Sequence, residues 1–287
     1  MTATGYASPR ALRTTAWLTE HLEDPRVRVL DGSFHLPGSG RDAREEYRRQ
    51  HIPGAGFFDI DGVCASDTDL PHMLPTADAF AVAAEALGIG NDDAVVVYDA
   101  PGSAAAARVW WTFRIFGHRD VAVLDGGLAK WLAEGRPVDD RPPNPRPTRY
   151  RARFDGALVR SRSELIANLA HGREQVVDNR GPGRFAGVEP EPRPARKRGH
   201  IPGSRNIPFT AFLDGERFGV WRPAEALAQV FAAAGVDLDR AIVASCGSGV
   251  TACTTAFAAH LLGRDHVAVY DGSWAEWGNR DDTPVDP

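Results

Sequence analysis

Four short blocks of this 287-residue sequence occur twice, in the same order and about half a chain apart. The matched pairs are Val29-Leu30-Asp31 with Val176-Val177-Asp178, residues 51–55 with 200–204, residues 95–99 with 242–246, and residues 123–127 with 269–273. The offset between the copies stays between 146 and 149 residues, and this constancy along the chain indicates duplication rather than chance. The sequence therefore predicts two similar domains.

Each copy alternates short apolar runs with amphipathic helical patterns. Helices are predicted over residues 77–87, 105–116, 128–134, 161–170 and 223–234, the fourth with Ser161 as N-cap and Glu164 three positions later. Strands that alternate with helices predict an α/β fold with a parallel sheet. Five prolines within residues 136–148 indicate an extended linker. We expect a first domain at 11–138, a linker at 139–158 and a second domain at 159–287.

Composition narrows the possible partners. The net charge of −5 argues against nucleic-acid binding, which needs a basic excess, and no apolar run is long enough to cross a membrane. Residues 1–10 lack the apolar core of a signal peptide, and three cysteines do not make a disulfide framework. No metal-spaced Cys/His cluster or phosphate-binding glycine loop is present in the sequence. We expect a cytoplasmic monomer without metal or organic cofactor.

Cys246 lies where an apolar strand pattern gives way to a helix pattern through a loop with two glycines. Gly247 and Gly249 permit backbone conformations in which several N–H groups turn inward, and the helix N-terminus adds partial positive charge. Both features favour a thiolate and can hold an anionic atom attached to its sulfur. We predict a nucleophilic Cys246, with its sulfur exposed at the mouth of the loop.

The other cysteines and the repeated histidines have structural interpretations. Cys64 lies in a polar loop and Cys253 in the first turns of the helix, so neither has a glycine cradle. The repeat places Asp99 opposite Cys246, and we therefore expect the first domain to be inactive alone and to contribute to a cleft between domains. His51 and His200 recur in both copies and are expected to pack in turns.

Six motifs give the chain a resemblance to the two-domain rhodanese (sulfurtransferase) family. They are Cys246-Gly247-Ser248-Gly249-Val250-Thr251-Ala252, Gly183-Arg184-Phe185, Glu189-Pro190-Glu191-Pro192-Arg193, Gly199-His200-Ile201-Pro202-Gly203, Ala107-Arg108-Val109-Trp110-Trp111 and Tyr270-Asp271-Gly272-Ser273-Trp274. The resemblance covers about residues 15–280 and implies tandem rhodanese-like domains, each a parallel β-sheet flanked by helices. The cysteine loop resembles the 3-mercaptopyruvate sulfurtransferase branch, because thiosulfate enzymes typically have basic residues where Gly247 and Ser248 stand.

The resemblance also implies residue roles. Arg184 and Arg193 match positions that bind the substrate carboxylate, to which a planar guanidinium is suited. Ser248, His72 and Asp61 match a proton relay, with Asp59 as the competitor of Asp61. The catalytic loop is expected to bind the transferred sulfur through its backbone, at the residues Gly247, Gly249, Val250 and Thr251.

The implied reaction is a double displacement. Cys246 takes sulfur from 3-mercaptopyruvate, pyruvate leaves, and the resulting persulfide passes its outer sulfur to a small thiol, a thioredoxin-like protein or cyanide. Three alternatives remain: a thiosulfate:cyanide sulfurtransferase, a cysteine phosphatase of related fold, and a non-catalytic sulfur carrier or interaction module. Such phosphatases need an arginine six positions after the cysteine, where this chain has Ala252.

Overall fold

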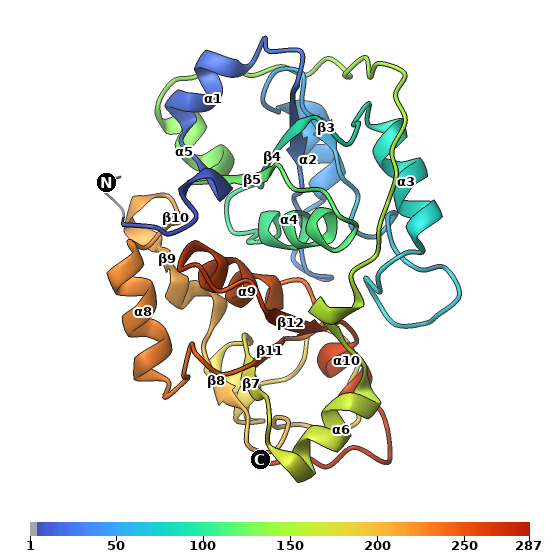
Figure 1. Cartoon of the computed structure of the whole chain (residues 1–287), viewed down its shortest axis with the longest axis vertical. Helices are drawn as coiled ribbons and strands as arrows, with labels where there is room; N and C mark the ends of the chain where they lie inside the picture. The colour runs from blue at the N-terminus through green and yellow to red at the C-terminus, as the bar shows by residue number, and fades with distance from the viewer. Residues whose placement is uncertain (1–4) are drawn as a thin grey trace.

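The computed structural model describes residues 5–287, and its backbone repeats one α/β arrangement twice (Figure 1). The first sheet has the strand order β1-β5-β4-β2-β3 and the second the order β6-β12-β11-β7-β8, so strands that correspond in the repeat occupy corresponding places. All pairs within these two sheets are parallel. The predicted duplicated fold, with parallel sheets flanked by helices, is confirmed.

The elements of the first half are β1 Leu12–Arg13, α1 Thr15–His21, β2 Val27–Asp31, α2 Ala43–Arg49, β3 Gly56–Phe57, α3 Ala77–Ala86, β4 Ala94–Tyr98, α4 Ala106–Ile115, β5 Val121–Leu124 and α5 Gly127–Ala133. Those of the second half are β6 Val159–Arg160, α6 Arg162–His171, β7 Gln175–Asp178, α7 Pro182–Phe185, β8 Arg205–Asn206, β9 Leu213–Asp214, β10 Val220–Trp221, α8 Ala224–Ala233, β11 Ile242–Ser245, α9 Ala252–Leu261, β12 Val267–Tyr270 and α10 Ser273–Trp277. The strands β9 and β10 form a separate antiparallel hairpin.

The five predicted helices agree with the observed ones to within one residue at each end. Ser161 caps α6 and forms the predicted reciprocal capping box with Glu164. The helix α2 was not predicted, because Tyr47 is its only buried residue and the rest of its surface shows no apolar period. Its stability comes instead from Asp42, whose carboxylate accepts the Glu45 N–H at its N-terminus.

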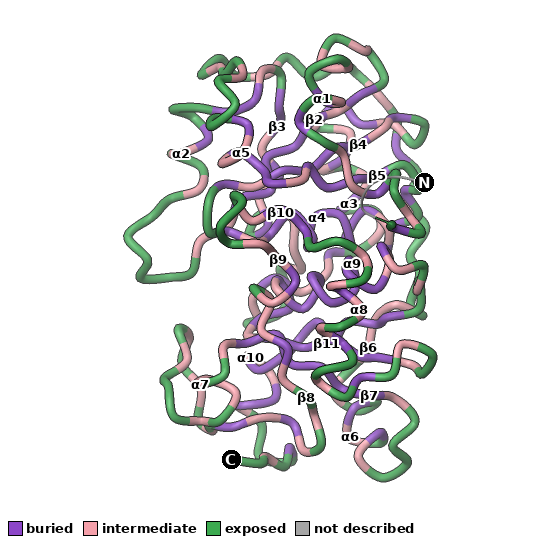
Figure 2. Tube along the Cα trace, turned by 90° about the vertical axis from the view of Figure 1, so that its left-hand side faces the viewer, coloured by how far each residue is buried: buried purple, intermediate pink, exposed green. Residues whose placement is uncertain are grey.

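The two halves meet along α4 and α9, which lie side by side at the centre of the molecule (Figure 1). Both helices are buried almost all round, as expected of helices enclosed on every side. Trp110 of α4 meets Phe257 of α9 edge to face, with ring centroids 4.8 Å apart. Burying a side chain such as Phe257 contributes roughly 1.5–3 kcal/mol, and the buried trace continues from one half into the other (Figure 2).

Residues 140–155 contain no helix or strand and run along the first half. Several contacts hold this segment there, among them those from the Tyr150 N–H to Glu85 Oε1 at 2.9 Å and from the Arg153 N–H to the Phe116 carbonyl at 2.9 Å. We propose that this segment forms most of the connection between the two domains, which we expect at residues 139–158. No helix within residues 5–287 combines the length and apolarity needed to cross a membrane.

Candidate active site at the Cys246 loop

Cys246 directly follows β11 and precedes α9, at the edge of the second sheet where its parallel strands end. Its side chain is only 2% exposed, so the expectation of an exposed sulfur is wrong. The loop is covered because side chains close over it. A Cβ on Gly247 would lie 2.6 Å from Nη2 of Arg184, so the guanidinium rests where a larger residue would project. Glycine is needed there to admit the arginine.

The bend of the loop depends on Gly249. Its φ of +77° lies in the region that residues with a Cβ rarely adopt. A Cβ at this position would also come within 2.7 Å of the Asp271 carbonyl oxygen. Because of this close approach, the loop packs against the turn after β12, which contains the hydrogen-bond acceptor of the Cys246 N–H. The Cys246 N–H donates to Oγ of Ser273 at 3.1 Å, and Ser273 Oγ donates to the Tyr270 carbonyl at 2.8 Å.

The backbone N–H groups of the loop are left available. Among the residues that the structure describes, those of Gly247 to Thr251 donate no hydrogen bond to the chain. The loop also leads into the N-terminus of α9, which carries partial positive charge. Available amides and a helix N-terminus together favour an anion at Cys246.

The matching position of the first half shows what an anion does in this setting. Asp99 follows β4 as Cys246 follows β11, and its Oδ2 accepts the N–H groups of Ala105 and Ala106 at 2.6 and 2.9 Å. A carboxylate of the chain itself thus accepts hydrogen bonds from the amides at the start of α4. At Cys246 no side chain does so within residues 5–287.

The two arginines singled out in the sequence have different surroundings. Arg184 Nε donates to Glu191 Oε2 at 3.0 Å, and Glu191 also binds Arg180, whose Nη1 donates to Oε1 at 2.6 Å. Arg193 has no carboxylate within ion-pair distance among the described residues. Its Nε is buried and has no hydrogen-bond partner. Arg193 is therefore the less compensated cation of the two.

His72 lies between Asp61 and Arg193. Its Nδ1 is 3.1 Å from Asp61 Oδ1, although the pair lacks the alignment of a regular hydrogen bond, and Nη2 of Arg193 is 3.0 Å from Nε2. Because guanidinium nitrogens only donate, Nε2 must accept, which leaves the proton on Nδ1. Burial lowers the pKa of His72, with Asp61 opposing the effect. The imidazole is therefore neutral near pH 7.

Asp59 and Ser248, the remaining candidates for the predicted relay, form no hydrogen bond with His72 within residues 5–287. Asp59 instead forms an ion pair with Arg44, and its Oδ1 accepts the Asp61 N–H at 3.1 Å. The pKa of Asp61 is lowered, chiefly by its contact with His72. Ser248 is buried, and within residues 5–287 its hydroxyl forms no hydrogen bond with His72. The structure thus brings together Asp61, His72 and Arg193.

The remaining cysteines are held as thiols. The Cys64 Sγ donates to the Asp61 carbonyl at 2.9 Å, and burial raises the pKa of its thiol. The Cys253 Sγ donates to the Gly249 carbonyl at 3.3 Å, and burial raises the pKa of that thiol strongly. Neither environment activates sulfur. His51 and His200 stack on Tyr47 and Phe185, respectively, as expected of packing residues.

Sequence reasoning did not assign a role to Arg108, which reaches the site from α4. Its Nη1 donates to Asp271 Oδ1 at 2.6 Å and to the Gly249 carbonyl at 3.2 Å, and its Nη2 donates to the His72 carbonyl. Asp271 Oδ2 accepts the Leu74 N–H at 2.7 Å. Arg108 and Asp271 therefore fasten the segment that carries His72 to the cysteine loop.

Ser273 was also missed, although the repeat contains a signal. The first copy reads Asp125-Gly126-Gly127 where the second reads Asp271-Gly272-Ser273, so a side chain appears where its counterpart has none. Ser273 has a φ of +48°, which is unfavourable for a residue with a Cβ. Such strain is typical of functional sites, and here it places the hydroxyl that accepts the Cys246 N–H.

Comparisons with known proteins show what this chain is similar to. The model of the rhodanese-like domain matches residues 14–134 and 161–280. Human 3-mercaptopyruvate sulfurtransferase is 47% identical over 280 residues, which cover 94% of each chain. A thiosulfate sulfurtransferase of Cricetulus griseus is 47% identical over 277 residues, covering 93% of this chain and 92% of the relative. The crystal structure of the 3-mercaptopyruvate sulfurtransferase SseA from Escherichia coli superposes with a TM-score of 0.83 at 34% identity, over 93% of this chain and 99% of that chain.

Proposed function

The chain belongs to the rhodanese-like family, and from that premise we propose that it is a sulfurtransferase that takes sulfur from 3-mercaptopyruvate and releases pyruvate. The observation that carries the proposal is a cysteine loop with available amides, which Arg184 contacts and which Arg108 joins to the segment of His72, the partner of Arg193. The amides of Gly247 to Thr251 suit a sulfur anion, and Arg193 suits the carboxylate of the donor.

In the first step, the Cys246 thiolate attacks the sulfur of 3-mercaptopyruvate. A sulfur–sulfur bond forms, the carbon–sulfur bond breaks, and its electron pair leaves on carbon as the enolate of pyruvate. A proton, which the attacked sulfhydryl group released, ends on that carbon, so the products are pyruvate and a Cys246 persulfide anion. The loop amides stabilise this anion, and one such donor is typically worth about 100- to 1,000-fold in rate.

Arg193 and Arg184 bind the carboxylate of the donor. Arg193 supplies its buried Nε, which has no partner in the chain. Arg184 shares its charge with Glu191 but lies against Gly247, the residue that follows Cys246.

His72 and Ser248 carry the proton. In the unliganded structure the Nε2 lone pair of His72 accepts from Arg193. When a carboxylate engages that guanidinium, Nε2 becomes free to exchange a proton with the Ser248 hydroxyl, and Asp61 stabilises the imidazolium that forms. Catalytic hydrogen bonds of this kind often form only in the complex with substrate.

In the second step, the acceptor attacks the outer sulfur of the persulfide. The sulfur–sulfur bond breaks, its electron pair returns to Cys246 as thiolate, and the acceptor leaves with one additional sulfur atom. We propose a small thiol or a thioredoxin-like protein as the acceptor, with cyanide as a substitute in the assay. The three cysteines are unpaired thiols, which fits a reducing, cytoplasmic setting, and we propose a monomer.

Thiosulfate is the second candidate donor, because a relative of 47% identity is named for it. The dianion gains from cations within the loop, whereas positions 247 and 248 here are glycine and serine. Steady-state kinetics with each donor and cyanide as acceptor would decide between them. We expect kcat/KM for 3-mercaptopyruvate to exceed that for thiosulfate, and the reverse order would replace this donor assignment.

A further inference from the structure

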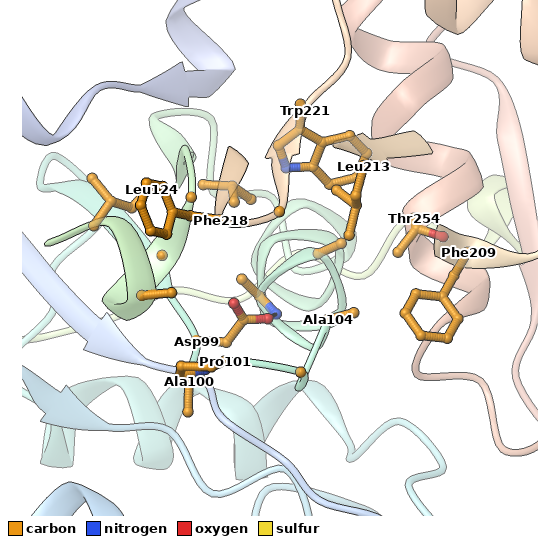
Figure 3. A pocket seen from close by; sticks show the side chains of 18 of the residues that line it. Asp99, Ala100, Pro101, Ala104, Leu124, Phe209, Leu213, Phe218, Trp221 and Thr254 are labelled. Atoms are coloured by element: carbon orange, nitrogen blue, oxygen red, sulfur yellow. Dashed lines mark hydrogen bonds between the residues drawn. The ribbon is translucent and has the colours of Figure 1, made fainter. Parts of the chain in front are cut away.

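A cavity of about 410 Å³ lies between the halves at Asp99, at the position of the first copy that matches Cys246 (Figure 3). Most of its lining is apolar and comes from both halves. Asp99 and Leu124 line it from the first half, and Thr254, Leu213, Phe218 and Trp221 from the second. This volume is within the usual range of small-molecule sites. The reaction proposed for Cys246 makes no use of it.

The surroundings of the cavity repeat those of the Cys246 loop. The Trp221 N–H donates to Asp125 Oδ1 at 2.9 Å, as the Leu74 N–H donates to Asp271 at 2.7 Å. In each case, a segment of one domain binds the aspartate of the other domain that lies in the turn next to Asp99 or Cys246. Four non-glycine residues of the described chain have a positive φ. His72 and Ser273 belong to the Cys246 site, and Ala104 and Phe218 line the cavity.

One residue difference between the two repeats accounts for the difference between the Asp99 region and the Cys246 region. Counted from the starts of α4 and α9, the counterpart of Arg108 is Thr254, which lines the cavity and whose hydroxyl donates to the Thr251 carbonyl. Gly102, with a φ of +79°, corresponds to Gly249, whose carbonyl binds Arg108 and whose φ is +77°. The cavity therefore lies where the other side of the molecule holds a buried guanidinium.

The acids of this region lack the cation that Arg108 gives to Asp271. Neither Asp99 nor Asp125 has a cation at ion-pair distance within residues 5–287. Asp99 uses Oδ2 for two backbone N–H groups, and no hydrogen bond of the described chain reaches its Oδ1. Asp125 is not itself part of the lining, although its neighbours Leu124 and Gly126 are, and its Oδ1 accepts the Trp221 N–H.

The pKa values of both acids reflect this lack of compensation. Burial is the main cause that raises the pKa of Asp99 and of Asp125 to about 6 in each case. The charged groups that face Asp99 are Asp31 and His35, and those that face Asp125 are Lys130 and Arg217, which lower the pKa of Asp125 only in part. A cation placed beside them would stabilise both carboxylates.

We propose that this cavity binds a small cationic molecule, with a guanidinium, amidinium or ammonium head beside Asp99. Its apolar body packs against Leu213, Phe218 and Trp221, which lie across the cavity from Asp99 (Figure 3). The head takes the place that Arg108 holds on the other side, and apolar walls with one charged contact are typical of ligand pockets. The site is separate from Cys246 and does not depend on the sulfurtransfer proposal.

Calorimetric titration of the full chain with benzamidinium tests the proposal, with neutral benzamide as the matched probe. At about pH 7.5, where both carboxyl groups are ionised, we expect benzamidinium to bind about tenfold tighter or more, the range of one charge-assisted hydrogen bond. Asp99→Asn removes this preference, whereas Asp92→Asn, which changes an exposed carboxylate of the same half, leaves it intact.

Two further variants locate the probe. Thr254→Arg supplies the guanidinium from the chain and abolishes binding, whereas the near-isosteric Thr254→Val retains it. Protein alkylated at Cys246 binds benzamidinium with unchanged affinity. Equal affinity for benzamide and benzamidinium, absence of binding, or loss of binding after alkylation would each overturn the proposal, and none of these results bears on sulfur transfer.

Discussion

The Arg108 guanidinium and the Asp271 carboxylate meet at 2.6 Å between the two halves, with side chains 4% and 3% exposed. This ion pair joins the segment that carries His72 to the turn that supports Cys246, because Arg108 also binds the carbonyls of His72 and Gly249. The Cys246 loop of one domain is thus held by an arginine of the other. We propose that the first domain, which has Asp99 at the position of Cys246, contributes to the active site of the second.

Replacing Arg108 tests this positioning role. Arg108→Met leaves the Asp271 carboxylate buried without its cation, and breaking such a pair costs about 3–5 kcal/mol in the free energy of unfolding. We expect urea denaturation to show this loss and the double variant Arg108→Met/Asp271→Asn to recover part of it. Additive effects in the double-mutant cycle would show that the pair is not coupled.

Arg193 and Arg184 differ in their ion-pair partners, so substitutions can distinguish their contributions to substrate binding. Arg193→Ala removes a cation that no carboxylate of the described chain compensates, so we expect kcat/KM for 3-mercaptopyruvate to fall about 10- to 150-fold, the worth of one charge-assisted hydrogen bond. Arg184→Ala is expected to lower it less, since Glu191 keeps Arg180 as partner.

A control for both variants is Arg196→Ala, which changes an arginine of the same segment whose side chain is 62% exposed. Cys246 should still react with a neutral alkylating agent in all three variants. Kinetics of Arg193→Ala equal to those of Arg196→Ala would remove Arg193 from the binding site.

The protonation of His72 predicts the acid limb of the rate profile. Burial lowers the pKa of His72 below its ordinary value of 6.5, so the group loses its accepting lone pair only at lower pH. We expect kcat/KM to stay level as pH falls through 6.5 and to decline below it. Because Asp61 raises this pKa, Asp61→Asn should move the decline to still lower pH. A shift toward higher pH in Asp61→Asn would contradict the assigned pairing.

The repeat made the fold predictable from sequence, because matched apolar strands at a constant offset imply matched sheets. Helices with an apolar stripe, such as α3 and α8, were predicted to within one residue at each end. The hairpin of β9 and β10 was not predicted, since each strand has two residues and shows no period. The position of Cys246 after a strand likewise followed from local pattern.

The contacts between the halves were not predictable in the same way. Arg108 and Asp271 are separated by 163 positions, and their pairing depends on how α4 docks beside α9 rather than on any local pattern. The contact of Arg184 with Gly247, and the compensation of Arg184 by Glu191, depend on the path of residues 186–191. The cavity at Thr254 arises because this position lacks the large side chain that its counterpart Arg108 has. This difference is visible only when both halves are compared in three dimensions.

The most direct measurement of the central claim is the mass of the Cys246 peptide after incubation with 3-mercaptopyruvate in the absence of acceptor. The account predicts a gain of about 32 Da, one sulfur atom, on that peptide, with its loss on addition of cyanide and its absence in Cys246→Ser. An unchanged Cys246 peptide, or the same gain on the peptide of Cys64 or Cys253, would contradict it.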